Sequence, residues 1–184
     1  MNGYLDGMGF AQTILCRRIR SNNVCDNDME PLLSSMEMIV RAIVAVLGAA
    51  VLGWERERLG KPAGLRTQMM VGLGAAIFTM TTLKLYEELL INEKVAGFDP
   101  SRVIQGVIGG IGFLGAGTII QARGSVHGMT TAATIWVVGG LGIACGLGYY
   151  LLAGLSVVLA LSVLLGVGML EAHWIGDPES ATSE

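Results

Sequence analysis

The feature that most restricts the fold of this chain is a run of 41 residues, from 130 to 170, without Asp, Glu, Lys or Arg. A second uncharged run, from 103 to 122, contains 20 residues. A helix rises 1.5 Å per residue, so about 20 apolar residues cross the roughly 30 Å hydrocarbon core of a bilayer. The shorter run therefore predicts one transmembrane helix, and the longer run predicts two antiparallel helices joined by a tight turn.

The composition also indicates a membrane protein. The chain of 184 residues is 52% hydrophobic and 15% charged and contains 27 glycines, more than the roughly 7% glycine of average proteins. The predicted fold class is an all-α membrane protein with about five transmembrane helices that pack through glycine-rich faces. The expected transmembrane domain covers residues 36–171, with spans at 36–53, 67–86, 103–122, 130–148 and 151–170.

Two polar tails are expected outside these spans. Residues 172–184 form a short C-terminal tail. Residues 1–35 are a flexible tail, a short surface helix, or a product of a coding start placed upstream of the true start at Met29 or Met36, and the sequence leaves these alternatives open.

Basic residues between the spans predict the orientation of the chain. Residues 54–66 contain an excess of Lys and Arg, and Arg123 lies in the second short connection. By the positive-inside rule, both segments are expected in the cytoplasm. The N-terminus is then external and the C-terminus is cytoplasmic.

The glycines of the third span raise the question of a nucleotide site, because Gly110, Gly112 and Gly115 have the spacing G-x-G-x-x-G. The motif lies inside an apolar span without a βαβ context, so it does not indicate nucleotide binding. Small residues spaced by four allow helix backbones to approach closely in lipid. A pore or a site of backbone carbonyls is the alternative. The predicted helix-packing residues, within a subunit or between subunits, are Gly106, Gly110, Gly112, Gly115, Gly142 and Gly146.

Charged residues at the ends of the spans are the candidate functional group. No nucleophile–histidine set or metal-ligand cluster is visible in the sequence, so we expect no enzyme activity and no cofactor. The alternatives are a polar cluster that binds a partner or an ion, and ordinary interfacial charges that orient the helices. The candidate polar cluster is Glu55, Arg56, Glu57, Lys61, Arg66, Asp99 and Arg102.

Three segments resemble the MgtC/SapB family of bacterial membrane proteins: WERERLGKPAGLRTQMMVGLGA (54–75), DPSRVIQGVIGGIGFLGAGTI (99–119) and GMTTAATIWVVGGLGIACGLGYY (128–150). The resemblance covers residues 36 to about 170 and implies a protein of four or five spans in the bacterial inner membrane. The family often carries histidine where Gln68 stands. This chain is similar to the short SapB-like form, which lacks the C-terminal soluble domain of MgtC.

The resemblance implies a non-enzymatic regulator linked to low magnesium and intracellular survival. The implied partners are the lipid bilayer, further copies of the chain and a membrane protein such as F-type ATP synthase; no nucleic acid is expected. The alternative is a transporter or channel for Mg²⁺ or another solute. Transport usually leaves acids or broken helices at mid-membrane depth. The spans offer only groups such as Gln105, Thr118 and Thr134, which favours the regulator.

Overall fold

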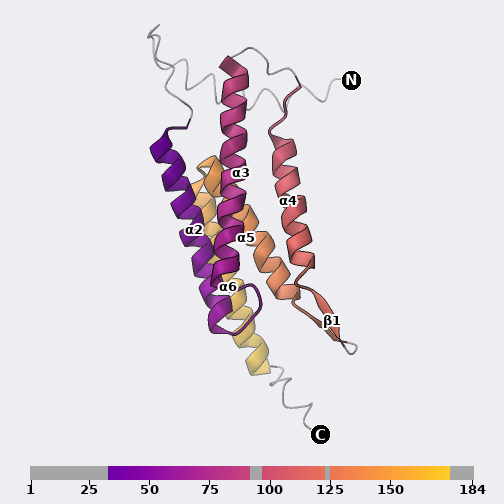
Figure 1. Ribbon diagram of the computed structural model, residues 1–184. Helices are drawn as coiled ribbons and strands as arrows, with labels where there is room; N and C mark the ends of the chain where they lie inside the picture. Colours follow the sequence, from indigo (N-terminus) through magenta and orange to yellow (C-terminus); the bar gives the residue numbers. More distant parts are fainter. Residues whose placement is uncertain (1–32, 92–96, 123–124, 175–184) are drawn as a thin grey trace, which may run out of the picture. The chain divides into compact units, whose positions relative to one another are not determined.

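The computed structural model describes residues 33–91, 97–122 and 125–174. The predictions for residues 1–32 and the start at Met29 lie outside the described residues, as do those for Arg123 and for residues 175–184. Five helices follow one another along the described chain, and a short hairpin separates the third helix from the fourth (Figure 1). They are α2 (Ser35–Arg58), α3 (Leu65–Ile91), α4 (Ser101–Ala116), β1 (Ile120–Ala122), β2 (Ser125–His127), α5 (Met129–Leu147) and α6 (Tyr150–Trp174).

The helices confirm the predicted fold class. In the part of the chain that the structure describes, α2, α3 and α5 are long and apolar enough to cross a bilayer. Two shorter apolar helices accompany them, α4 and the segment Tyr150–Gly166 of α6. α2 begins with a capping box, in which the Ser34 hydroxyl accepts from the Met36 amide and the Glu37 carboxylate accepts from the Ser34 amide.

Helix α4 ends before the end of the predicted third span. The expected span ran to residue 122, whereas α4 ends at Ala116 and residues 120–122 pair with 125–127 as an antiparallel hairpin. The amides of Thr118 and Ile119 bond to the carbonyls three residues earlier, and the Thr118 hydroxyl donates to the Gly115 carbonyl at 2.7 Å. These bonds tighten the last turn and end the helix. Hydropathy misses this end because residues 119 and 120 are isoleucines.

Helix α5 lies in the middle of the bundle and contacts α2, α3, α4 and α6. Its contact with α3 is close because glycines remove the side chains between the two backbones. A Cβ at Gly142 would collide with the Gly72 carbonyl and lie 2.7 Å from the Ala75 Cβ, and a Cβ at Gly146 would lie 2.7 Å from the Thr79 Cβ. The bundle is therefore held by backbone approach of the kind that small residues permit in lipid.

The other glycine motif is not used in this way within the chain. A Cβ at Gly106, Gly110 or Gly112 on α4 would meet no described atom within 4 Å. A Cβ at Gly115 would meet the Ala132 carbonyl oxygen at 3.4 Å, an ordinary contact. Of the six predicted packing glycines, Gly142 and Gly146 pack closely within the chain, and for Gly106, Gly110 and Gly112 a packing role remains a prediction about contacts with other chains.

Arg41 takes part in the bundle from the far end of α2. Its Nη1 donates to the Gly146 carbonyl at 2.7 Å, in the last turn of α5, where helix carbonyls lack intrahelical partners. Gly148 follows with φ of 82°, a left-handed conformation that suits glycine at a helix C-terminus. Arg41 therefore caps α5, a contact that its position near the start of the first span did not predict.

Candidate functional site

The candidate site is a pocket of about 760 Å³ at the end of the bundle where α2 ends and α5 begins. We call it the Glu55 pocket, and we call this end of the bundle the Glu55 end. Its walls come from the last turn of α2, the loop that follows, the end of the hairpin, the first turn of α5 and α6. The polar lining residues are Glu55, Arg56, Lys61, His127, Thr130 and Thr131.

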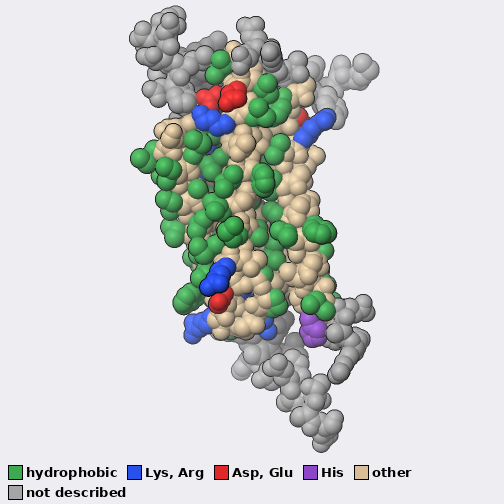
Figure 2. Space-filling view, viewed as in Figure 1, with side chains coloured by type: hydrophobic (Ala, Val, Ile, Leu, Met, Phe, Trp, Pro, Cys, Tyr) green, Lys and Arg blue, Asp and Glu red, His purple; other side chains and the backbone are tan. Residues whose placement is uncertain are grey.

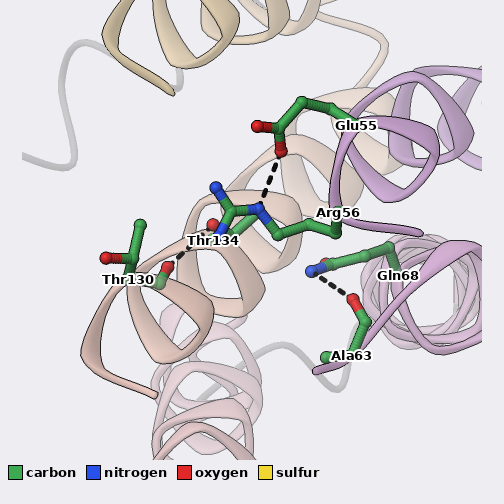
Figure 3. Close-up of polar contacts among 6 residues, drawn as sticks. All are labelled: Glu55, Arg56, Ala63, Gln68, Thr130 and Thr134. Carbon is green, nitrogen blue, oxygen red and sulfur yellow. Dashed lines mark hydrogen bonds and ion pairs between the residues drawn. The ribbon is translucent and has the colours of Figure 1, made fainter. Parts of the chain in front are cut away.

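A buried ion pair lines this pocket. The Arg56 Nε donates to the Glu55 Oε2 at 2.8 Å, and the two residues are only 5% and 8% exposed. In Figure 3, the Arg56 guanidinium points toward the first turns of α5, where Thr130 and Thr134 lie. The second Glu55 oxygen, Oε1, is buried and has no hydrogen-bond partner among the described residues. One acceptor of this carboxylate thus lacks a donor among the described residues.

The depth of the pair follows from the length of α2. Twenty residues separate Ser35 from Glu55 along the helix, a rise of about 30 Å, which matches the hydrocarbon core of a bilayer. Trp54, beside the pair, is 64% exposed, and tryptophan is enriched at membrane–water interfaces. If α2 crosses the bilayer, Glu55 and Arg56 lie at the level of the lipid headgroups.

Two side-chain hydrogen bonds hold the loop between α2 and α3 in place. The Glu57 Oε2 accepts from the Leu65 amide at 2.8 Å, so a carboxylate caps the N-terminus of α3, where negative charge is favourable. The fully buried Gln68 donates from its Nε2 to the Ala63 carbonyl at 3.2 Å (Figure 3). Ala63 has a positive φ of 53°, which is uncommon for a residue other than glycine. These two contacts hold the loop that carries Lys61 into the pocket.

The predicted polar cluster separates into two groups. Glu55, Arg56 and Lys61 line the pocket, and Glu57 and Arg66 are exposed near it. Asp99 and Arg102 lie at the start of α4, at the opposite end of the bundle (Figure 1), so the structure does not bring them to Glu55. Figure 2 shows the same division, with charged side chains gathered at two ends and a mostly uncharged band between them.

Asp99 has a local role at its own end. Its Oδ1 accepts from the Ser101 amide at 2.9 Å, and the Asp99 carbonyl accepts from the Arg102 amide at 3.2 Å. Hydrogen bonds from the Ser101 side chain and backbone lower the pKa of Asp99 below its ordinary value. The carboxylate thus orders the start of α4.

Sequence reasoning missed four residues of the site. His127, Thr130 and Thr131 line the pocket, and Gln68 holds the loop that carries Lys61 through its hydrogen bond to the Ala63 carbonyl. A signal existed for Gln68, since it is an amide side chain within an otherwise apolar span. The signal for His127 was the predicted topology, which places the connection between the third and fourth spans on the same side of the membrane as residues 54–66. Within the described ranges, no three His, Cys, Asp or Glu side chains come together as a metal-binding group.

Comparison with known proteins covers the segment from α2 to α6. The MgtC family model matches residues 42–173. YhiD of Escherichia coli (strain K12), whose name carries a provisional assignment as a magnesium transporter, is 40% identical over 128 residues, which cover 70% of this chain and 59% of YhiD. MgtC of Salmonella typhimurium is 34% identical over 139 residues, which cover 74% of this chain and 56% of MgtC.

A third relative is covered more fully. SrpB of Synechococcus elongatus is 38% identical over 140 residues, which cover 71% of this chain and 75% of SrpB. The matched part of the chain spans only a little over half the length of YhiD and of MgtC. No solved structure matches the chain. The family model covers well over half of the residues and the apolar helices are those of a membrane protein, so the chain belongs to the MgtC family.

Proposed function

We propose that this protein is a non-enzymatic regulator in the bacterial inner membrane, linked to adaptation to low magnesium and intracellular survival, and that it acts by binding a transmembrane helix of a partner protein. The observation that carries the proposal is an apolar groove between α3 and α4, here called the α3–α4 groove. Its volume is about 510 Å³. Gly74 of α3 and Gly106 and Gly110 of α4 line it, and a Cβ at any of the three would meet no described atom within 4 Å.

The two glycine motifs of the chain differ in how they are used. The Gly142–Gly146 face of α5 is filled by α3, while the Gly106–Gly110 face of α4 opens into the groove. Both have the spacing that brings helices together in lipid. A transmembrane helix of another protein can pack against the Gly106–Gly110 face of α4 in the way that α3 packs against the Gly142–Gly146 face of α5. This supports a docking function.

The core between the two charged ends supports a regulator over a conduit through one chain. Small and apolar side chains fill it, and the buried cluster includes Ala49, Leu52, Ala76, Val138 and Leu141. Threonine hydroxyls there donate to the backbone of their own helices, as Thr79 does to the Ala75 carbonyl at 2.8 Å. Ion pathways through membranes usually present charged or polar groups at this depth.

Crosslinking in cells tests the docking proposal. A photoreactive residue at Val107, in the groove, should give an adduct with a partner protein, and the same residue at Leu155, exposed on α6, should not. Adding Gly110→Leu to the Val107 probe should remove the adduct, because leucine fills the groove. Thermal unfolding of Gly110→Leu should match that of the unaltered protein, since the added side chain meets no described atom.

The identity of the adduct decides between occupants. F-type ATP synthase, the partner that the family resemblance implies, is the first candidate to examine by mass spectrometry. An adduct with twice the mass of the 19.3 kDa chain would show a second copy of the chain in the groove and would contradict docking of a different protein. Lipid adducts alone would contradict protein docking of either kind.

The name of YhiD is the observation that favours magnesium transport as a second candidate. Purified protein in liposomes should give no Mg²⁺ uptake above that of empty liposomes if it is a regulator. Mg²⁺ uptake that is lost in the Gly142→Leu variant and kept in the Gly140→Leu variant would show that the folded protein is a transporter. It would contradict the regulator proposal.

The proposed orientation has its own test. In a background with Cys16 and Cys25 changed to serine, a cysteine at Ser35 should react with a membrane-impermeant thiol reagent in intact cells. A cysteine at Lys61 should react only after lysis, because the two exposed positions lie at opposite ends of α2 and its loop. The reverse pattern would place the Glu55 end outside the cell.

A further inference from the structure

We propose that the Glu55 pocket binds a phospholipid headgroup that carries an N–H or O–H donor beside its phosphate. The phosphate would lie against Arg56 and Lys61, and the donor would bond to the open oxygen of Glu55. This inference does not depend on the docking of a partner at the α3–α4 groove, whose lining residues are different.

The first argument is the unsatisfied carboxylate oxygen. Glu55 is 92% buried (8% exposed), lines the pocket and directs one oxygen to Arg56, while its Oε1 has no hydrogen-bond partner among the described residues. A buried polar atom without a partner is costly, so an unpartnered oxygen on a residue that lines a pocket indicates that a donor binds in that pocket. The ligand must therefore bring an N–H or O–H group.

The second argument is the charge around that oxygen. The Arg56 guanidinium is in direct contact with Glu55, and Lys61 adds a second cation to the pocket lining. One carboxylate and two cations leave the lining positive. A metal cation attracted by Glu55 would meet repulsion of similar size from Arg56, whereas a phosphate can bond to both Arg and Lys. The ligand therefore also brings an anionic group.

The third argument is the position and the apolar wall of the pocket. Leu59, Val163 and Leu164 line one part of it, and the length of α2 places Glu55 at headgroup depth. Basic pockets between helices at this level bind lipid headgroups. A free phosphoester would satisfy Glu55 and Lys61 but leave the apolar wall unused, which favours a lipid as the source of the phosphate.

The test is a titration of the full purified chain in neutral detergent with short-chain lipids, read as the rise in the midpoint of thermal unfolding. Phosphatidylethanolamine and phosphatidylcholine are a matched pair, because both are zwitterionic and only the first has N–H donors. We expect the dihexanoyl form of phosphatidylethanolamine to stabilise the protein at lower concentration than that of phosphatidylcholine. Dihexanoyl phosphatidylglycerol, which has hydroxyl donors, should behave as phosphatidylethanolamine does.

Variants locate the effect in the pocket. Lys61→Ala should weaken the apparent affinity for phosphatidylglycerol about fivefold, the effect of removing one cation near an anionic headgroup. Arg66→Ala is the matched control, because Arg66 is an exposed cation near the same loop that does not line the pocket. Equal losses in both variants would show general surface attraction and overturn the site.

Two further outcomes decide the chemistry without any variant. Equal affinity of the unaltered protein for phosphatidylethanolamine and phosphatidylcholine would overturn the role of the Glu55 oxygen. If glycerol phosphate stabilises the protein as strongly as phosphatidylglycerol does, the claim that the bound phosphate belongs to a lipid is wrong. The pocket would then bind a free phosphoester.

Discussion

Replacing Gly142 with leucine is expected to destabilise the bundle by about 3 kcal/mol or more, at the upper end of the cost of overpacking a core. Even a Cβ at this position would collide with the Gly72 carbonyl and lie 2.7 Å from the Ala75 Cβ. Both obstacles belong to the backbone, or to a side chain without rotamers, so neither can move aside. The helices α3 and α5 must separate, and the measurement is unfolding of the purified protein by SDS titration.

Gly140 provides the matched control on the same helix. It is exposed, and a Cβ there would meet no described atom within 4 Å. Gly140→Leu should unfold at the same SDS fraction as the unaltered protein or slightly above it, since leucine favours helix more than glycine does. If the two variants were equally stable, the close approach of α3 and α5 would not hold the bundle together.

Replacing Arg56 with methionine is the second change with a large expected effect. It leaves the Glu55 carboxylate buried without its cation, and breaking a buried ion pair in this way costs about 3–5 kcal/mol. We expect the lower part of that range, because the pair lines a pocket at the end of the bundle and does not lie in its apolar core. Arg58→Met is the control, since Arg58 is an exposed cation on the same last turn and exposed substitutions usually change stability by less than about 0.5 kcal/mol.

A double variant separates charge from packing. Adding Glu55→Gln to Arg56→Met removes the uncompensated charge while keeping the size of the side chain, so it should recover at least half of the lost stability. SDS unfolding of the four proteins forms a double-mutant cycle. A double variant no more stable than Arg56→Met alone would show that the arginine acts by packing its aliphatic stem and not by pairing with Glu55.

The five helices of the described residues could be predicted because a helix that crosses a bilayer needs a long uncharged run of residues. Residues 130–170 are about twice as long as one span requires, so their length alone predicts two helices, and α5 and α6 are found there. Where a helix stops inside an apolar run is set by local hydrogen bonds, as between Thr118 and Gly115. Hydropathy carries no information about such bonds, so the end of α4 and the hairpin could not be predicted.

The site was partly predictable for a related reason. Charges close in sequence, such as Glu55, Arg56 and Lys61, remain close in the structure. Asp99 and Arg102 belong to the other end of the bundle, because α3 reverses the direction of the chain between them and Glu55. Glycine spacing likewise shows that a helix has a small face but not whether α3 or an outside partner covers it. Gly142 and Gly110 therefore look alike in the sequence and differ in the structure.

The bond from Arg41 to the Gly146 carbonyl joins residues 105 positions apart. During synthesis, α2 leaves the ribosome with a cation several residues inside its apolar segment, and the carbonyl that receives it does not yet exist. The cation must be tolerated by lipid or water until α5 is inserted. Helix α2 therefore reaches its final surroundings only after α5 has been inserted, which makes the closing of this bundle a late event in its assembly.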